Sequence, residues 1–221
     1  MSGLTRSLKY ASFRAMRVVR NCLLMAVGFV FYFTLLDGEG FALQNLLPRF
    51  PLMLMFTGNL MFMLYGMLDT ATYMQLTLTY GCTRKNAGIS TVYMHLLQML
   101  VLEVVMAVSC VCIPASWQAV DGRMLCLMTL TLLLFGSGLS LVTGILIRRF
   151  GRVAYIIFVI FAALGGGMIG GLTGFSGGTA PLMVSLQGSL NLPVLLMAGI
   201  ACYAVMTAVF CISIRGIEVR V

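Results

Sequence analysis

Side chains that could do chemistry are few in this chain, because 61% of its 221 residues are hydrophobic and only 9% are charged. Glu103 is the one acidic residue inside a long apolar run, and Asn59 lies at a similar depth in another such run. A charged residue at the centre of a membrane costs roughly 2.5–3.5 kcal/mol on insertion scales, so it usually faces a cavity or a partner. The two residues therefore predict either the lining of a substrate path or a structural hydrogen bond from Asn59 to Glu103.

A serine and a histidine raise the alternative of an intramembrane protease. The segment Gly174-x-Ser176-Gly177 is similar to the nucleophile motif of rhomboid proteases. A serine nucleophile needs a base within hydrogen-bond reach, and the only histidine, His95, is expected most of a bilayer away, near a loop on the opposite side. A tight re-entrant turn explains the glycines better, so we assign no catalytic residue and predict that the chain is not an enzyme.

The sequence also lacks the patterns that hold metals and nucleotides. Cys110-x-Cys112 is the one closely spaced pair among the seven cysteines, and no second pair completes a metal site. The cysteines are expected to pack as small apolar thiols between helices, without a disulfide framework. Residues 171–180 are glycine-rich but lack the Gly-Lys-Ser/Thr of a phosphate loop. We therefore expect this chain itself to bind no cofactor, metal or ATP.

The elements that position these residues are apolar runs of membrane-crossing length. The mean hydropathy is +1.04, and about 20 apolar residues in a helix span a hydrocarbon layer. The sequence predicts an all-α membrane protein with one domain, 1–221, and six transmembrane helices. The six predicted spans are Val18–Leu36, Pro51–Leu68, Ile89–Ile113, Met124–Ile147, Val153–Leu172 and Pro193–Ile214.

Basic residues set the predicted orientation. With the N-terminus inside, twelve of the 14 Lys and Arg residues fall in cytoplasmic segments, and only Arg49 and Arg123 fall outside. Cytoplasmic loops carry the excess of Lys and Arg, so both termini are predicted to be cytoplasmic. The formal net charge of +8 is scattered between apolar runs, which favours lipid headgroups over nucleic acid as the partner.

Residues 1–17 precede the first span and carry an amphipathic pattern. On a helical wheel, at about 100° per residue, the basic residues lie within one arc, with Leu4, Leu8, Ala11 and Ala15 opposite them. The basic residues of this arc, which extends into the span, are Arg6, Lys9, Arg14, Arg17 and Arg20. The pattern predicts an interfacial amphipathic helix on an anionic leaflet, and a disordered basic tail is the alternative.

Glycines mark the end of the predicted fifth span. Gly166 and Gly170, and likewise Gly167 and Gly171, are small-x-x-x-small pairs that let helix backbones approach closely. They predict either a dimer seam or gate, or ordinary packing within one subunit. The uncharged residues 173–192 predict a re-entrant segment between the fifth and sixth spans, shielded by protein.

Residues 76–86 form the longest polar interruption, within a predicted cytoplasmic coupling segment 70–88 between the second and third spans. From residue 70 the chain is expected to leave the bilayer as a short helix that ends near Tyr80 and Gly81, and Thr83 is expected to cap the next helix. Arg84 and Lys85 then lie on the cytoplasmic side, where they either meet acidic groups of a partner or anchor to lipid phosphate.

The pattern Tyr80-Gly81-x-Thr83-Arg84-Lys85, preceded by aliphatic residues, resembles the first cytoplasmic loop of type 2 ABC transporter permeases. In that family this loop presses on the ATPase subunit. The resemblance therefore implies a multi-pass permease of the bacterial plasma membrane whose five motif residues couple it to an ATPase. The sequence departs from the family after Lys85, where Asn86-Ala87-Gly88 replaces bulky apolar residues.

The resemblance also implies partners and a mechanism. Two copies of a separate ATPase subunit would bind ATP and Mg²⁺, and a second permease subunit, identical or paralogous, would join through the first and fifth spans. Closure of the ATPases would export an apolar or amphipathic substrate, such as a lipid, peptide or drug-like molecule, by alternating access. The alternatives are an intramembrane enzyme, which needs clustered polar groups, and a secondary transporter or channel subunit, which usually shows inverted repeats.

Overall fold

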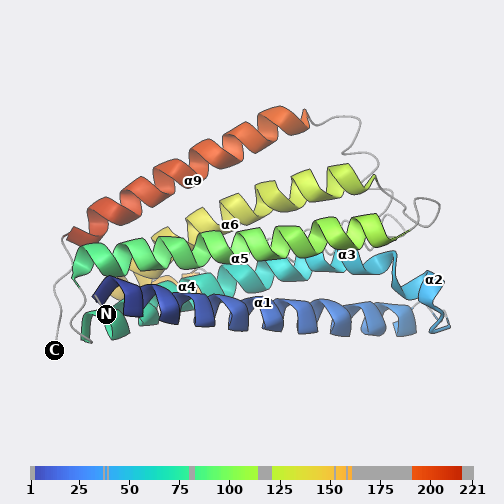
Figure 1. The fold of residues 1–221 in the computed structure, drawn as a ribbon, viewed down its shortest axis with the longest axis horizontal. Helices are drawn as coiled ribbons and strands as arrows, with labels where there is room; N and C mark the ends of the chain where they lie inside the picture. The colour runs from blue at the N-terminus through green and yellow to red at the C-terminus, as the bar shows by residue number, and fades with distance from the viewer. Residues whose placement is uncertain are drawn as a thin grey trace.

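The computed structural model is helical throughout the part of the chain that it describes, with no strand there (Figure 1). The described residues are 3–36, 38, 40–79, 83–113, 121–151, 153–157, 159–160 and 191–215. The predicted all-α class is confirmed for these residues. The helices are α1 (Gly3–Leu36), α2 (Leu43–Leu46), α3 (Arg49–Met53), the π-helical turn η1 (Leu54–Gly58), α4 (Asn59–Thr79), α5 (Arg84–Cys112), α6 (Gly122–Phe150) and α9 (Leu192–Arg215).

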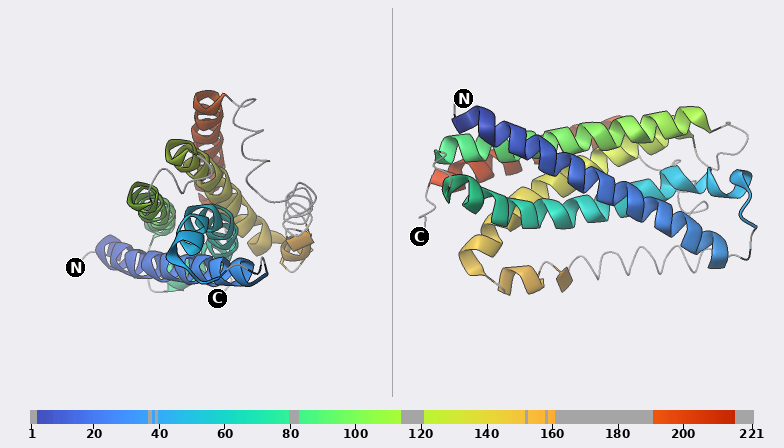
Figure 2. Two further views of the ribbon diagram at one scale, coloured as in Figure 1. Left: turned by 90° about the vertical axis from the view of Figure 1, so that its right-hand side faces the viewer. Right: turned by 60° about the horizontal axis from the view of Figure 1, so that its bottom comes forward.

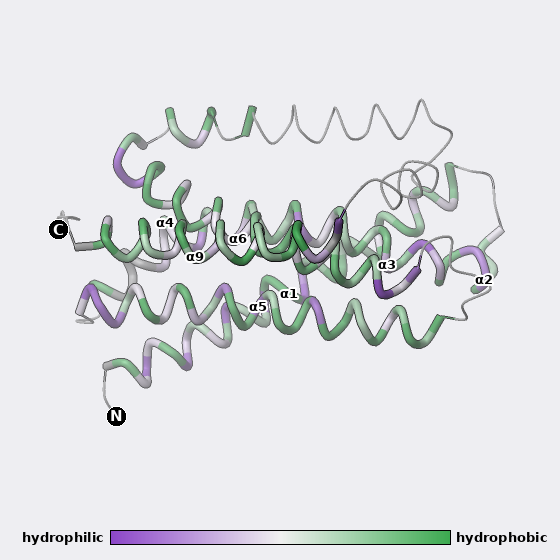
Figure 3. The backbone as a smooth tube through the Cα atoms, turned by 90° about the horizontal axis from the view of Figure 1, so that it is seen from above, coloured by the Kyte–Doolittle hydropathy of each residue, from purple (hydrophilic) through white to green (hydrophobic). Residues whose placement is uncertain are grey.

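Five stretches of the described chain are long and apolar enough to cross a membrane. They are Leu4–Leu36, Leu43–Tyr73, Arg84–Cys112, Gly122–Phe150 and Pro193–Ile214. Apolar residues cover most of the length of these helices, as Figure 3 shows for α6 and α9. The predicted fifth span, Val153–Leu172, lies largely outside the described residues, as do its glycine pairs and the predicted re-entrant segment 173–192.

The N-terminal region is not a helix of its own. Residues 3–36 form the single helix α1, because neither proline nor glycine interrupts the sequence between Leu4 and Val27. Small and β-branched residues continue along one buried face, including Ala11, Ala15 and Val18. The prediction of a separate interfacial helix over 1–17 is thus corrected to one continuous element, which crosses the other helices at an angle (Figure 2).

One end of the bundle collects the basic residues. There α1 begins, α4 ends, α5 begins, and α6 and α9 end (Figure 1). The basic residues of these helix ends are Arg6, Lys9, Arg84, Lys85, Arg148, Arg149 and Arg215, whereas Arg49 and Arg123 begin α3 and α6 at the other end. The predicted cytoplasmic location of this end stays a prediction.

The helices are longer than a hydrocarbon layer is thick. α5 and α6 have 29 residues each, which at a rise of about 1.5 Å per residue gives roughly 43 Å. A hydrocarbon core measures about 30 Å. If the ends with Arg49 and Arg123 lie at one membrane surface, the basic end extends about 13 Å beyond the hydrocarbon on the other side.

Close packing of α4 on α6 depends on small residues of α6. A methyl group added at Gly144 would lie 2.5 Å from Thr70 Cβ, and one added at Gly136 would lie 2.8 Å from Asn59 Oδ1. Ser140 lies between these glycines on the same helix face, so α6 presents a small-x-x-x-small stripe to α4. This stripe brings α4 and α6 close together, whereas the predicted glycine pairs of the fifth span lie outside the described residues and stay a prediction.

Candidate functional site

The cap of α5 is formed as predicted. Thr83 has an extended backbone, and its hydroxyl accepts a hydrogen bond from the backbone N–H of Asn86 at 3.3 Å. Such a bond satisfies one of the free N–H groups of the first helical turn. Arg84 and Lys85 follow directly in that first turn and are exposed. Tyr80 and Gly81 lie outside the described residues.

The prediction of a short helix that starts at residue 70 is corrected. α4 runs without a break from Asn59 to Thr79, and Asp69, Thr70 and Tyr73 are buried within the bundle. Polar residues here do not mark the end of the helix, because each of these three side chains contacts a neighbouring helix. The link from α4 to α5 is therefore the short segment 80–83 between two long helices, at the basic end of the bundle.

The predicted hydrogen bond from Asn59 to Glu103 is not formed in the structure. The amide oxygen of Asn59 faces Gly136 of α6, and no hydrogen bond joins it to Glu103. Glu103 is half-buried on α5, and its Oε2 is buried without a hydrogen-bond partner in the described part of the chain. Gln98, five residues earlier on α5, is fully buried, and neither of its amide atoms has a partner there. The role of Asn59 and Glu103 in a substrate path stays a prediction.

Four residues on three helices meet at what we name the His95 junction: Thr70 of α4, His95 of α5, and Ser137 and Ser140 of α6. All four are buried. His95 Nε2 lies 3.2 Å from Thr70 Oγ1, and Nδ1 lies 3.3 Å from Ser137 Oγ and 3.4 Å from Ser140 Oγ. Phe62 of α4 packs edge-to-face on the imidazole, with 5.8 Å between ring centroids.

The hydroxyl protons set the direction of these hydrogen bonds. Thr70 donates to the backbone carbonyl of Gly66 at 2.7 Å, and Ser140 donates to the carbonyl of Ser137 at 2.8 Å. Thr70 Oγ1 is then left to accept from Nε2–H of His95, so that Nδ1 accepts the proton of Ser137. A neutral imidazole in this tautomer satisfies the junction.

The His95 junction suits helix connection better than nucleophilic catalysis. A serine and a histidine at this distance have the reach of a nucleophile and its base. However, the Ser137 hydroxyl that donates to the imidazole is fully buried, the Ser140 proton is donated to a carbonyl, and no acidic side chain of the described residues contacts the imidazole to orient it. The junction joins α4, α5 and α6 through side chains that are shielded from solvent.

Sequence reasoning placed His95 near a loop as a packing residue and missed this junction. A usable signal was present, because antiparallel helices pair residues whose numbers add to a nearly constant sum. The predicted third span ends at Ile113 and the fourth begins at Met124, which sets this sum near 237. The observed contacts of His95 with Ser137 and Ser140 give sums of 232 and 235. Ser176, the other member of the protease alternative, lies outside the described residues.

A second polar group, which we name the Tyr73 cluster, joins α1 to α4 and α5. It consists of Ser7, Tyr10, Arg14, Asp69, Tyr73 and Ser90. Arg14 forms an ion pair with Asp69, and the Tyr73 hydroxyl donates to the backbone carbonyl of Ser7 at 2.9 Å. The rings of Tyr10 and Tyr73 stack with 5.6 Å between centroids. The helical-wheel pattern predicts Arg14 on the basic arc that faces the leaflet, whereas the structure turns Arg14 toward α4.

In the described residues, no group of three or more His, Cys, Asp or Glu side chains is arranged to hold a metal ion.

No family model matches this chain, and no curated protein or solved structure matches it either.

Proposed function

We propose that this chain is the membrane-spanning permease subunit of an ATP-driven exporter of the type 2 ABC class, in a bacterial plasma membrane. Two separate ATPase subunits would bind ATP and Mg²⁺, and a second permease subunit, identical or paralogous, would complete the transporter. The observation that carries the proposal is the tip of the α4–α5 hairpin, where Thr83, Arg84 and Lys85 match the family pattern and are exposed.

The position of this tip suits a docking site for a cytoplasmic partner. Thr83 caps α5, which fixes the direction of its first turn and of the two basic side chains that follow. With Arg49 and Arg123 at the opposite membrane surface, the length of α5 and α6 would carry the basic end of the bundle about 13 Å past the hydrocarbon. Arg84 and Lys85 would therefore lie within reach of acidic groups on an ATPase surface, where complementary charge sets orientation and partner choice.

Both arms of the hairpin are connected to the interior of the bundle. α4 contributes Thr70 and α5 contributes His95 to the His95 junction with α6. A push on the tip would thus move two helices whose buried side chains contact a third. In the proposed cycle, closure of the ATPases presses on the tip, and the motion of α4 and α5 against α6 opens the path outward.

The buried polar atoms of α5 support an amphipathic substrate over a wholly apolar one. Gln98 and Glu103 present polar atoms with no hydrogen-bond partner among the described residues. Buried polar groups are normally satisfied by protein, water or ligand. A substrate with a polar headgroup and an apolar tail would satisfy these atoms, and the apolar surfaces of the helices would accept its tail.

Charge reversal at the tip tests the proposal. In membranes of the native host, a tagged parent chain should co-purify with a protein that contains a phosphate loop, identified by mass spectrometry. The pair Arg84→Glu and Lys85→Glu should reduce the recovered ATPase by about tenfold or more, since like charges across an interface cost several kcal/mol.

The matched control is the pair Arg6→Glu and Lys9→Glu, which makes the same charge change at the same end of the bundle, on exposed positions of α1. We expect the control to keep its ATPase. Equal recovery from the tip variant and the parent would remove the coupling role of Arg84 and Lys85, and a parent chain that recovers no ATPase would contradict the permease proposal.

A further inference from the structure

An ion pair lies between the first turns of α1 and the middle of α4. The guanidinium of Arg14 contacts Oδ1 of Asp69, and the two side chains are 24% and 4% exposed. The second oxygen of Asp69 is buried and has no hydrogen-bond partner in the described part of the chain. A buried ion pair stabilises a fold only when its remaining polar atoms are also satisfied, because desolvation otherwise offsets the attraction. This ion pair is therefore expected to contribute little net stability to the packing of α1 on α4.

Tyr73 makes the other polar contacts of the same segment. Its hydroxyl donates to the carbonyl of Ser7 and lies 3.4 Å from Ser90 Oγ of α5, and its ring stacks on Tyr10. At the border of the segment, the Ser12 hydroxyl lies 3.3 Å from the Tyr93 hydroxyl. Residues 3–15 of α1 are thus held across both arms of the α4–α5 hairpin by a few polar contacts.

Apolar contacts also hold this interface. Ala11 and Ala15 of α1 are fully buried and form a small cluster with Tyr73 of α4 and Met94 of α5. Further along α1 the contacts change, since Val18, Val19 and Cys22 belong to the main hydrophobic core. The cluster under residues 3–15 contains fewer buried side chains than the main core that contacts α1 from residue 18 onward, so polar contacts carry a larger share of the packing of residues 3–15.

We propose that Arg14 and Asp69 form an ionic latch, and that residues 3–15 of α1 leave the α4–α5 hairpin as a unit when it opens. The physical reason is the burial of Asp69. If Arg14 alone swung away, Asp69 would stay behind as a buried charge with only the weaker influence of Arg17 to compensate it. Lifting the whole segment instead exposes Asp69 to water, so the pair and the segment open together. Closed, the latch braces both arms of the hairpin; open, it frees them to move.

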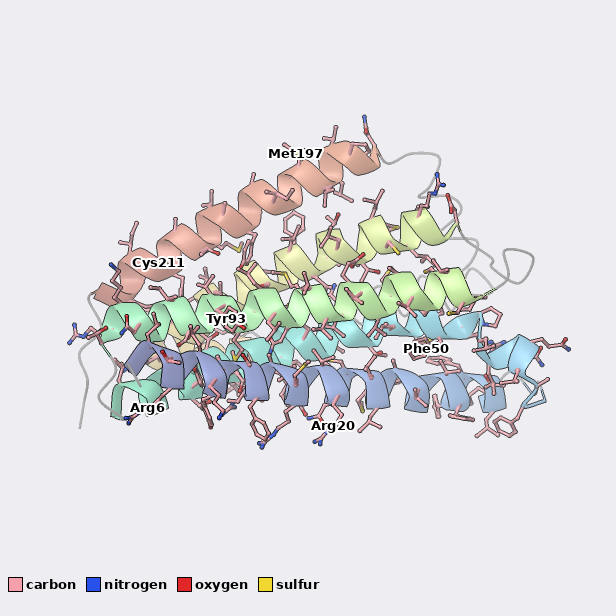
Figure 4. All side chains as sticks on the ribbon, in the orientation of Figure 1. Arg6, Arg20, Phe50, Tyr93, Met197 and Cys211 are labelled. Atoms are coloured by element: carbon pink, nitrogen blue, oxygen red, sulfur yellow. The ribbon has the colours of Figure 1, made fainter. Side chains whose placement is uncertain are left out.

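Arg17 is exposed on α1, one turn beyond Arg14, and its charge acts on Asp69 more weakly than that of Arg14. Arg6 and Arg20 are exposed, and Figure 4 shows Arg20 on the side of α1 that faces away from the other helices. Among the basic residues of the α1 arc, Arg14 is the one that forms an ion pair with Asp69, and this contact defines the closed position of the segment.

The test measures access to Ser7, which is 4% exposed in the closed position. Full-length Ser7→Cys protein in lipid nanodiscs is treated with N-ethylmaleimide, and peptide mass spectrometry quantifies the label at position 7, so that native cysteines are not counted. Labelling should be slow in this parent and at least about tenfold faster after Asp69→Asn or Arg14→Gln, because reactivity follows the open population. The exchange Arg14→Asp with Asp69→Arg should restore slow labelling.

Two references frame the result. Lys9→Cys, at an exposed position of the same segment, gives the rate for full access, and Glu103→Gln removes a half-buried acid from elsewhere on α5 without an expected change at position 7. Labelling of Ser7→Cys as fast as Lys9→Cys would show that the segment is not docked, and overturn the latch.

Unchanged labelling in Asp69→Asn and Arg14→Gln would overturn it as well. If one of these variants fails to assemble by size-exclusion chromatography, the other decides; if both singles and the exchange fail, the pair is a static brace and not a latch. The experiment needs no ATPase, so its outcome is independent of the permease proposal.

Discussion

Ionisable and polar side chains inside this helical bundle are accommodated in three different ways. His95 is satisfied as a neutral ring by hydroxyls of two neighbouring helices. Arg14 and Asp69 compensate each other's charge. Glu103 keeps one buried oxygen without a partner among the described residues. The first arrangement favours rigidity, the second permits a switch, and the third leaves a polar atom available to a ligand.

At this scale we predict an energetic coupling between His95 and Ser137. His95→Phe keeps an aromatic ring but removes the acceptor of the Ser137 proton, and Ser137→Ala removes the donor. In a double-mutant cycle the two should couple by about 0.5–1 kcal/mol, as interhelical hydrogen bonds in membranes do. The measurement is unfolding in mixed micelles with increasing dodecyl sulfate.

Ser109→Ala serves as the control for this cycle, because the Ser109 hydroxyl donates to the carbonyl of Met106 on its own helix, at 2.8 Å. It should show no coupling to His95→Phe. Strictly additive effects of His95→Phe and Ser137→Ala would mean that the contact contributes nothing to stability, and the transmission of motion through the junction would lose its basis.

At the scale of the helix, the stripe of small residues on α6 decides how closely α4 approaches. Because Gly136, Ser140 and Gly144 have little or no side chain, α4 and α6 lie close together. The imidazole of His95 on α5 can then reach both Thr70 of α4 and Ser140 of α6. Helix packing and the polar junction are therefore linked: a bulkier α6 would separate the hydrogen-bonding groups as well as the backbones.

Two alanine substitutions should have opposite signs. Replacing glycine by alanine within a helix gains up to about 1 kcal/mol in helix propensity. Gly28→Ala on α1, where nothing lies within 4 Å of an added methyl group, should be neutral or stabilising. Gly144→Ala, whose methyl group would lie 2.5 Å from Thr70 Cβ, should be destabilising by about 1–3 kcal/mol despite that gain.

Thermal unfolding of the detergent-solubilised variants measures both effects. A Gly144→Ala protein as stable as Gly28→Ala would show that α4 and α6 separate without cost, and that the stripe does not set their distance.

At the scale of the whole molecule, the helix ends sort by charge. The start of α1 and the end of α9 lie at the same end of the bundle as the α4–α5 hairpin tip (Figure 1). An excess of basic residues at one end is typical of the cytoplasmic side. A partner that acts on the hairpin tip would therefore also find the first turns of α1 beside it, where the proposed latch lies.

Reporter fusions test this orientation. Green fluorescent protein joined after Arg215, at the end of α9, should fluoresce, because it folds in the cytoplasm. Alkaline phosphatase joined after Ile113, at the end of α5, should be active, because that enzyme needs an oxidising compartment. Active phosphatase after Arg215 with an inactive fusion after Ile113 would reverse the topology and place Arg84 and Lys85 outside.

The sequence by itself determined the features that depend on single segments. Apolar run length set which stretches form long helices, since a backbone in hydrocarbon must satisfy its hydrogen bonds internally. Thr83 was identifiable as a cap because the capping bond is local, reaching only to Asn86. The clustering of basic residues at one end followed from counting along the chain.

Only the tertiary structure decided which polar residues meet. A helical wheel shows that Arg14 lies near other basic residues, but not that Asp69, 55 positions later, turns it inward. α1 and α4 are also longer than predicted. In α4, the polar residues Asp69, Thr70 and Tyr73 were expected to mark the membrane surface, but neighbouring helices bury them and the helix continues to Thr79. The pairing of helix faces depends on rotation and register, and these are set by contacts far apart in the sequence, such as Thr70 with His95.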